Sequence, residues 1–172
     1  MIEILILYIT QKREKTMYAI RKEIFDVFGS YTKPSIGTIY PALKRLLKMG
    51  AISLNERMSE GGKKSSYYSI TQEGVKAFRD LFFETTSDNP SLFYPQLLTR
   101  ISIMDFLSLE DRKLFIQEAE KQIELLQLDI KKKLDDEFLK LTYYQRIVLE
   151  STKNSLISLS EFIKQIKVEN DG

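Results

Sequence analysis

Lysine and arginine are the residues whose placement first indicates a chemistry in this sequence of 172 residues. No acidic residue occurs between Asp26 and Glu56, while that interval carries four basic ones, Lys33, Lys44, Arg45 and Lys48. Residues 1–80 hold 14 basic and 8 acidic side chains, a net charge of +6, although the whole chain carries only +2. The rest of the chain is therefore acidic, at −4. This asymmetry indicates a polyanion-binding head on a separate body, with a chance imbalance of charge as the alternative.

Several other chemistries are excluded by composition. The chain has no cysteine, histidine or tryptophan, so it cannot form a zinc site with the usual nitrogen and sulfur ligands or use histidine- or cysteine-dependent catalysis. The acidic residues 135–137 follow three lysines, a pattern typical of a solvated helix face rather than a metal site. We predict no enzymatic activity, no cofactor and no metal. A small enzyme that uses lysine and carboxylates is the remaining alternative.

The apolar segments predict no association with a membrane. The longest apolar run, Ile4 to Ile9, is far too short to span a bilayer. It lacks the basic leader and cleavage site of a secretory signal. The absence of cysteine fits a reducing compartment, so we expect a cytoplasmic protein.

Hydrophobic spacing and capping residues predict a helix-rich first half. Residues 2–10 read as a short apolar helix or buried strand, and residues 11–15 as a turn. Thr16 is placed to cap a helix over 17–28, and Ser35 to cap a third helix that runs to Met49 and stops at Gly50. Two β-like runs, 52–58 and 66–70, surround a Gly-Gly loop and predict a hairpin. A fourth helix follows Thr71 and reaches about residue 86. This order is that of a winged helix-turn-helix.

The second half is predicted to be entirely helical. Residues 87–91 form the best linker candidate, and three helices are expected over 95–106, 109–138 and 143–168. The latter two begin after the capping residues Ser108 and Thr142. Their apolar stripes predict helices packed antiparallel or against a partner chain. The members of these stripes are Ile123, Leu126, Ile130 and Leu134 in the first and Leu156, Leu159, Ile163 and Ile166 in the second.

Two motifs in the first half resemble a known family. The run Pro34 to Leu46, PSIGTIYPALKRL, resembles the recognition helix of the PadR family of bacterial transcriptional regulators, whose pattern is close to S-x-G-T-[LI]-Y-P-A-L-x-R-L. The run Tyr68 to Gly74, YSITQEG, resembles the Y-x-[LI]-T-x-x-G of that family's wing. Together the motifs cover about residues 1–80. The remainder resembles, in length and helical character, the C-terminal dimerisation domain of the long PadR subfamily.

The chain departs from the family pattern at three places. Residues 17–20 read Met-Tyr-Ala-Ile where the family usually has Gly-Tyr-Glu-Ile, and Ile36 takes the place of a frequent proline. Ser65 and Ser66 precede Tyr67 where the family often has a basic residue. The last departure moves the expected phosphate contact of the wing to Lys63 or Lys64.

The recognition helix supplies most of the predicted DNA contacts. A helix fits the major groove, and its N-terminal residues reach base edges. Gly37 permits close approach of the backbone, Thr38 and Tyr40 offer hydroxyl groups, and Lys44 is placed for a phosphate. A solvated helix face is the alternative. The predicted contacts on this helix are Ser35, Gly37, Thr38, Tyr40, Lys44 and Arg45.

The wing supplies the other predicted contacts. Lys63 and Lys64 lie at the tip of the Gly-rich hairpin, where they reach the neighbouring minor groove or its backbone. An ordinary exposed loop is the alternative. Tyr67 and Tyr68 alternate across their strand, and we expect Tyr68 to be the one in the core.

An aromatic-rich segment is the candidate effector site. Aromatic residues at helical spacing more often form core, and that is the alternative here. The family resemblance implies a small hydrophobic or phenolic effector bound in the C-terminal region or at the dimer interface. The candidate residues are Phe82, Phe93, Tyr94, Arg100 and Phe106.

Together these observations predict a mainly α protein with an α+β head. Residues 1–86 would form a winged helix-turn-helix DNA-binding domain, and residues 92–172 an all-helical dimerisation and effector domain. The expected function is that of a homodimeric repressor that binds a palindromic operator in double-stranded DNA and is released by the effector. The alternative is a winged-helix adaptor that binds protein instead of DNA.

Overall fold

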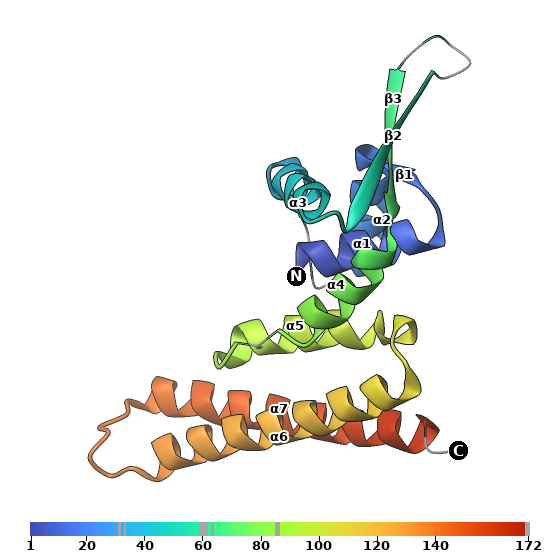
Figure 1. Cartoon of the computed structure of the whole chain (residues 1–172). Coiled ribbons are helices and arrows are strands. Elements are labelled where there is room, and N and C mark those ends of the chain that lie inside the picture. Colours follow the sequence, from blue (N-terminus) through green and yellow to red (C-terminus); the bar gives the residue numbers. More distant parts are fainter. Residues whose placement is uncertain (31, 33, 59–61, 63, 85–86, 171–172) are drawn as a thin grey trace. The chain divides into compact units, whose positions relative to one another are not determined.

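The chain folds into two compact units, one of which holds most of the first half of the sequence. The computed structural model describes residues 1–30, 32, 34–58, 62, 64–84 and 87–170, with side chains as far as residue 166 (Figure 1). The first unit comprises Met1–Thr86 and Tyr94–Phe106, and the second comprises Ser87–Phe93 and Leu107–Gly172.

The first unit contains a winged helix-turn-helix, as predicted. Three helices precede a two-stranded hairpin and a fourth helix, and a short extra strand stands before the second helix. In order, these elements are α1 (Ile2–Lys12), β1 (Lys15–Thr16), α2 (Met17–Phe28), α3 (Ile36–Lys48), β2 (Ile52–Met58), β3 (Lys64–Ile70) and α4 (Gln72–Phe82).

The sheet has three antiparallel strands in the order β1-β3-β2. In the hairpin Ile52 pairs with Ile70 and Met58 with Lys64, so β3 begins two residues earlier than predicted. Strand β1, which was predicted as part of a turn, pairs Lys15 with Tyr68. Figure 1 shows the β2–β3 hairpin extending away from the helices of the head.

Helix α1 is the centre of the head. The alternative of a buried strand over 2–10 is wrong, because all seven residues from Ile4 to Thr10 are buried within one helix. Buried residues all round a helix require neighbours on every side. Helix α1 accordingly contacts α2, α3, α4 and β3. These helices contribute buried residues to the core, among them Ile24, Leu43 and Phe78, each at most 1% exposed.

Side chains cap most helices where the sequence placed them. The hydroxyl of Thr16 accepts the N–H of Ala19 at 3.3 Å, and that of Thr71 accepts the N–H of Gly74 at 3.0 Å. Ser35 stands at the N-cap position of α3, but its side chain makes no capping bond. Gly50 adopts φ +69°, the left-handed conformation that ends α3.

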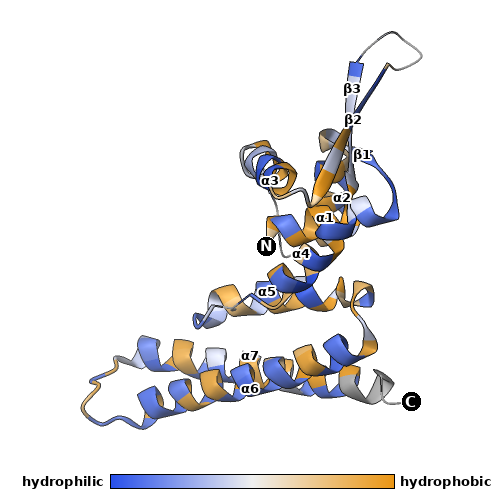
Figure 2. Ribbon diagram, in the orientation of Figure 1, coloured by the Kyte–Doolittle hydropathy of each residue, from blue (hydrophilic) through white to orange (hydrophobic). Residues whose placement is uncertain are grey.

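The second unit is a helical hairpin. Helices α6 (Leu109–Asp135) and α7 (Tyr143–Asn170) pack against each other, and Figure 2 shows hydrophobic and hydrophilic residues alternating along both. Ser108 caps α6 by accepting the N–H of Asp111 at 3.1 Å. Thr142 and Gln145 form a reciprocal capping box at the start of α7. The predicted stripes are buried at Ile123, Leu126, Ile130, Leu156, Leu159 and Ile163, and are partly exposed at Leu134 and Ile166.

The first helix of the second half begins earlier than predicted. Helix α5 spans Pro90–Ile101, followed by the 3₁₀ turn η1 (Met104–Phe106). Pro90 occupies the first helical position, where the missing N–H costs nothing, and the side chain of Asn89 accepts the N–H of Ser91 at 2.9 Å. The end of the predicted linker is therefore a helix start. No helix in the described part of the chain is long and apolar enough to cross a membrane.

Candidate nucleic-acid interface

The exposed side of α3 carries all the residues that the sequence predicted for it. Ser35, Gly37, Thr38, Tyr40, Lys44 and Arg45 are all exposed. The opposite side, Ile39, Ala42, Leu43 and Leu46, is at most 1% exposed and packs into the head. The helix has no acidic residue and ends with basic ones, so its outer face is positively charged.

Gly37 lies on the exposed side, and no contact among the described residues requires a glycine there. Its φ is not positive, and in that part of the chain a Cβ added to it would meet only the Oγ of Ser35, at 3.4 Å. A glycine within a helix costs about 1 kcal/mol relative to alanine. The space beside Gly37 could therefore hold a side chain, but glycine leaves it empty. Another molecule can approach the backbone of α3 closely at this point.

The side chains of Thr38 and Tyr40, near the start of α3, each make a contact within the helix. The Oγ1 of Thr38 donates to the carbonyl of Ser35 at 2.8 Å. The methyl group of Thr38 is therefore held in a fixed orientation. One turn further along, the Nζ of Lys44 lies 4.6 Å from the ring centroid of Tyr40, which is 48% exposed. These two side chains form a cation–π pair on the surface of the helix.

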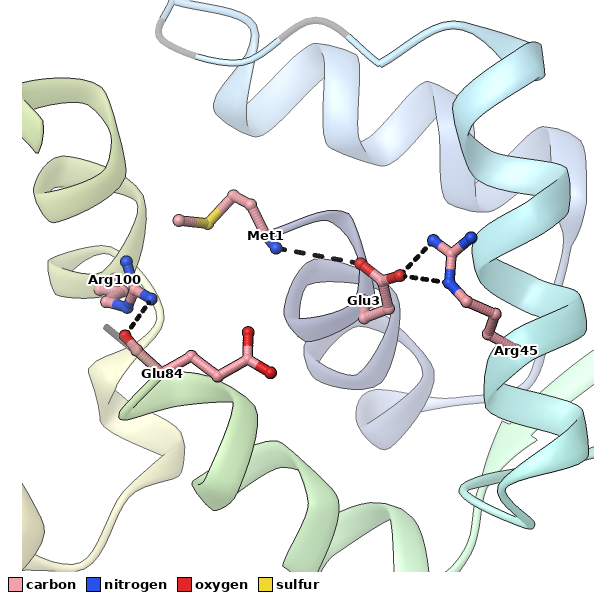
Figure 3. A network of polar contacts seen from close by, with 5 residues as sticks. All are labelled: Met1, Glu3, Arg45, Glu84 and Arg100. Atoms are coloured by element: carbon pink, nitrogen blue, oxygen red, sulfur yellow. Dashed lines mark hydrogen bonds and ion pairs between the residues drawn. The ribbon is translucent and has the colours of Figure 1, made fainter. Parts of the chain in front are cut away.

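Arg45 is held by a carboxylate of another helix. Its Nε and Nη2 both donate to Oε1 of Glu3 in the first turn of α1, the former at 2.9 Å (Figure 3). The terminal amine of Met1 lies 3.9 Å from the other oxygen of Glu3. Burial alone would raise the pKa of Glu3, but the hydrogen bonds and the positive charges outweigh it, so this pKa lies below its ordinary value.

The wing is described only in part. Lys63, a predicted contact, lies outside the described residues. Lys64 is exposed at the start of β3 and pairs with Glu56 on β2 at 2.6 Å. Tyr68 is 8% exposed, which confirms it as the core tyrosine. Tyr67 is partly exposed, and the guanidinium of Arg57 lies 5.8 Å from its ring centroid.

Helix α2 has an exposed face that was not predicted from the sequence. Tyr18, Arg21, Lys22 and Phe25 are all exposed and recur at the spacing of one helix face. In a helix-turn-helix the first helix crosses the DNA backbone, where basic and hydroxyl groups meet phosphates. The spacing itself was the signal, because aromatic and basic residues at i, i+3, i+4 and i+7 mark one face.

The candidate effector residues do not form one cluster. Phe82 and Phe106 both pack on Phe78, with ring centroids 5.7 and 4.6 Å away. Phe93 belongs to the second unit, and Tyr94 is 46% exposed. Two surface hollows between described residues of the α6–α7 unit, of about 280 and 500 Å³, are lined by none of the five residues.

Arg100 is the most unusual of these residues. It is 4% exposed, and its guanidinium donates to the carbonyl of Phe82 at 2.7 Å. It also donates to the carbonyl of Glu84 at 3.0 Å (Figure 3). Its Nη1 has no hydrogen-bond partner among the described residues. Burial lowers the pKa of this guanidinium, while the charge of Glu84 opposes the shift. The Nη1 of Arg100 is thus a buried donor of the first unit whose acceptor is not among the described residues.

Comparison with known proteins identifies the family of the head. A family model described as the transcriptional regulator PadR-like family matches residues 6–80. A PadR family transcription regulator from hypervirulent Clostridium difficile is 30% identical, with 46% of this chain and 81% of that chain covered and a TM-score of 0.41. A protein from Streptococcus mutans UA159 is 32% identical, with 46% and 71% covered and a TM-score of 0.41.

A further solved structure covers nearly the whole chain. The Bacillus subtilis PadR in complex with operator DNA is 16% identical, covers 98% of each chain and has a TM-score of 0.44. No curated protein matched the sequence. The matched family model and the identity to the Clostridium difficile regulator decide the assignment. The chain belongs to the PadR-like family of transcriptional regulators.

Proposed function

We propose that this regulator binds double-stranded DNA by placing α3 in the major groove. The observation that carries the proposal is the exposed basic face of α3, with an unfilled space beside Gly37 at its N-terminal end. Residues at the start of a recognition helix reach base edges. Ser35, Thr38 and Tyr40 supply hydroxyl groups and a methyl group there, and Lys44 supplies a charge for a phosphate.

The wing and α2 extend the proposed contact to the DNA backbone. Lys63 and Lys64 would meet phosphates beside the neighbouring minor groove, and Arg21 and Lys22 would meet those beside the major groove. Such contacts hold the protein in register without reading sequence. The exposed charges of α2 and of β3 support this arrangement.

The proposed active form is a homodimer joined through the C-terminal helices. The second unit exposes apolar side chains on α7, among them Tyr143 at 71%, Tyr144 at 77% and Val148 at 63%. Exposed apolar side chains in such density mark a contact surface. A two-fold axis would present two heads to successive major-groove faces, so the operator would be palindromic with half-sites about one helical turn apart.

Repression would be relieved by a small hydrophobic or phenolic effector. Phe106, which is partly exposed, and the Nη1 of Arg100, which has no hydrogen-bond partner among the described residues, offer an apolar surface and one donor within the first unit. Tyr94, which is 46% exposed, would contribute further aromatic surface. The effector must bind the DNA-free form more tightly than the DNA-bound form, because a ligand with equal affinity shifts nothing. The protein would act in the cytoplasm.

The test is the salt dependence of DNA binding. Purified protein is titrated against a labelled duplex from the region upstream of its own gene, with a random duplex as reference. Each phosphate engaged contributes a slope of about 0.9 in log affinity against log salt. A slope of several units and tighter binding to the upstream duplex are expected. Binding that is absent or insensitive to salt would refute the proposal and favour the protein-binding adaptor.

A matched pair of variants locates the interface. Tyr40→Ala should weaken binding to the upstream duplex, while the dimer measured by light scattering stays intact. Tyr144→Ala should dissociate the dimer at low protein concentration, because Tyr144 is exposed on α7. Loss of the dimer in the first variant would place the subunit interface in the head.

A further inference from the structure

The recognition helix has two kinds of basic residue, which differ in their direction and partners. Lys44 and Lys48 lie one turn apart in line with Gly37, on the side opposite the buried Leu43 and Leu46. Arg45 leaves the flank of the helix and reaches α1, where both described hydrogen bonds of its guanidinium end on Glu3 (Figure 3). Its charge is therefore already matched by a carboxylate of the head.

Glu3 has a side chain with a well-defined position in the head. Its side chain is only 19% exposed, and it lies in the first turn of α1, where the helix dipole favours a negative charge. The rest of α1 is buried from Ile4 to Thr10. A side chain attached to such a helix has little freedom to move, so it can define where its partner lies.

The wing has a similar attachment beyond the other end of α1. Nη1 of Arg57 on β2 donates to Oε1 of Glu14, which lies two residues after the end of α1 and immediately before β1. The same guanidinium lies over the ring of Tyr67 on β3. One arginine thus connects both strands of the hairpin to the segment between α1 and β1. An arginine–carboxylate pair therefore joins the recognition helix to α1, and another joins the wing to the residues that follow α1.

We propose that Arg45 and Arg57 are positioning residues: through Glu3 and Glu14 they fix the recognition helix and the wing relative to α1, and they do not bind phosphate. This rests on the proposed DNA binding. A guanidinium that binds a phosphate here has to abandon a carboxylate held by the fold. As long as each pair stays closed it is neutral and releases no counterions from DNA.

The test compares salt slopes by fluorescence anisotropy on a labelled duplex of random sequence. The variants are Arg45→Gln, Glu3→Gln, Arg57→Gln and Glu14→Gln, with Lys44→Gln as the matched control. Each of the four should lower affinity by about threefold to fivefold, the equivalent of one exposed ion pair, and the two arginine variants should leave the slope unchanged. Lys44→Gln should reduce the slope by about 0.9, because it removes a phosphate contact.

Two results would overturn the assignment. A slope reduced by about 0.9 in Arg45→Gln or Arg57→Gln would make that arginine a phosphate ligand. A gain of affinity in Glu3→Gln would make this carboxylate a competitor of DNA instead of an anchor. Wild-type protein without salt-sensitive binding would refute the proposed function itself, an outcome that differs from both.

A charge exchange separates positioning from simple stabilisation. Arg45→Glu should bind weakly, and the double variant Glu3→Arg with Arg45→Glu should recover most of the lost affinity because the pair re-forms with reversed charges. Helical circular dichroism at the assay temperature confirms that each variant is folded. A double variant that is folded but binds no better than Arg45→Glu alone would contradict the role of the pair.

Discussion

Substitution of Gly37 by alanine should stabilise the fold but weaken DNA binding. The added methyl group meets only Ser35 Oγ, at 3.4 Å, and the backbone does not use the left-handed region. Alanine is therefore accommodated in the free protein. It should stabilise α3 by about 0.5 to 1 kcal/mol, because glycine loses more conformational entropy when a helix forms. For a head of this size that gain raises Tm by roughly 2 to 8 °C.

The same methyl group should impair DNA binding. A group inserted into a closely packed contact costs about 1 to 3 kcal/mol, and 1.4 kcal/mol corresponds to a tenfold change in affinity. We expect about a tenfold loss for Gly37→Ala on the upstream duplex. The salt slope should stay near that of the wild type, since no phosphate contact is removed.

Gly74 provides the control for the folding half of this prediction. A Cβ on Gly74 would lie 2.0 Å from the carbonyl oxygen of Ala51, which is backbone and cannot yield easily. Gly74→Ala should therefore lower the melting temperature, whereas Gly37→Ala raises it. The reasoning would be refuted if Gly37→Ala bound DNA as tightly as the wild type while showing the expected gain in stability.

Two further predictions concern stability. The pKa of Glu3 is lower in the folded state than its ordinary 4.5. The stability that the Glu3 carboxylate contributes is therefore fully present above the unfolded-state pKa and is lost as pH falls through the folded-state pKa. Urea unfolding at a series of pH values should show that the wild type loses stability more steeply in acid than Glu3→Gln. Ile163 on α7 is fully buried, so Ile163→Ala should cost about 2 to 5 kcal/mol of unfolding free energy. Gln165 is exposed on the opposite face of α7. Gln165→Ala should therefore change the unfolding free energy by less than about 0.5 kcal/mol.

The elements that the sequence predicted well are those whose causes are local. Helical periodicity and the caps Thr16, Thr71, Ser108 and Thr142 act within one or two turns, so helix order and most helix starts followed from them. The exposed face of α3 was equally local, because one side of a helix is set by spacing alone. The start of α5 was missed because Pro90 was interpreted as part of a linker rather than as a first helical residue.

The features that could not be predicted from the sequence depend on partners that lie far along the chain. Strand β1 has only two residues, and it exists because Lys15 and Thr16 pair with Tyr68 and Tyr67 of β3. The pairing of Arg45 with Glu3 joins residues 42 positions apart. Neither partner is marked by spacing, so the sequence did not predict that Arg45, an expected DNA contact, pairs with a carboxylate.

The order of the strands leaves β2 at the edge of the sheet with six exposed residues in succession. An open edge strand is a template on which another chain can add a strand, and so a starting point for aggregation. If the wing contacts DNA as proposed, a helix cannot cover it to prevent this. The charges of Glu56 and Arg57 discourage such pairing. Their replacement by β-branched residues would therefore endanger the solubility of the regulator before it affected its fold.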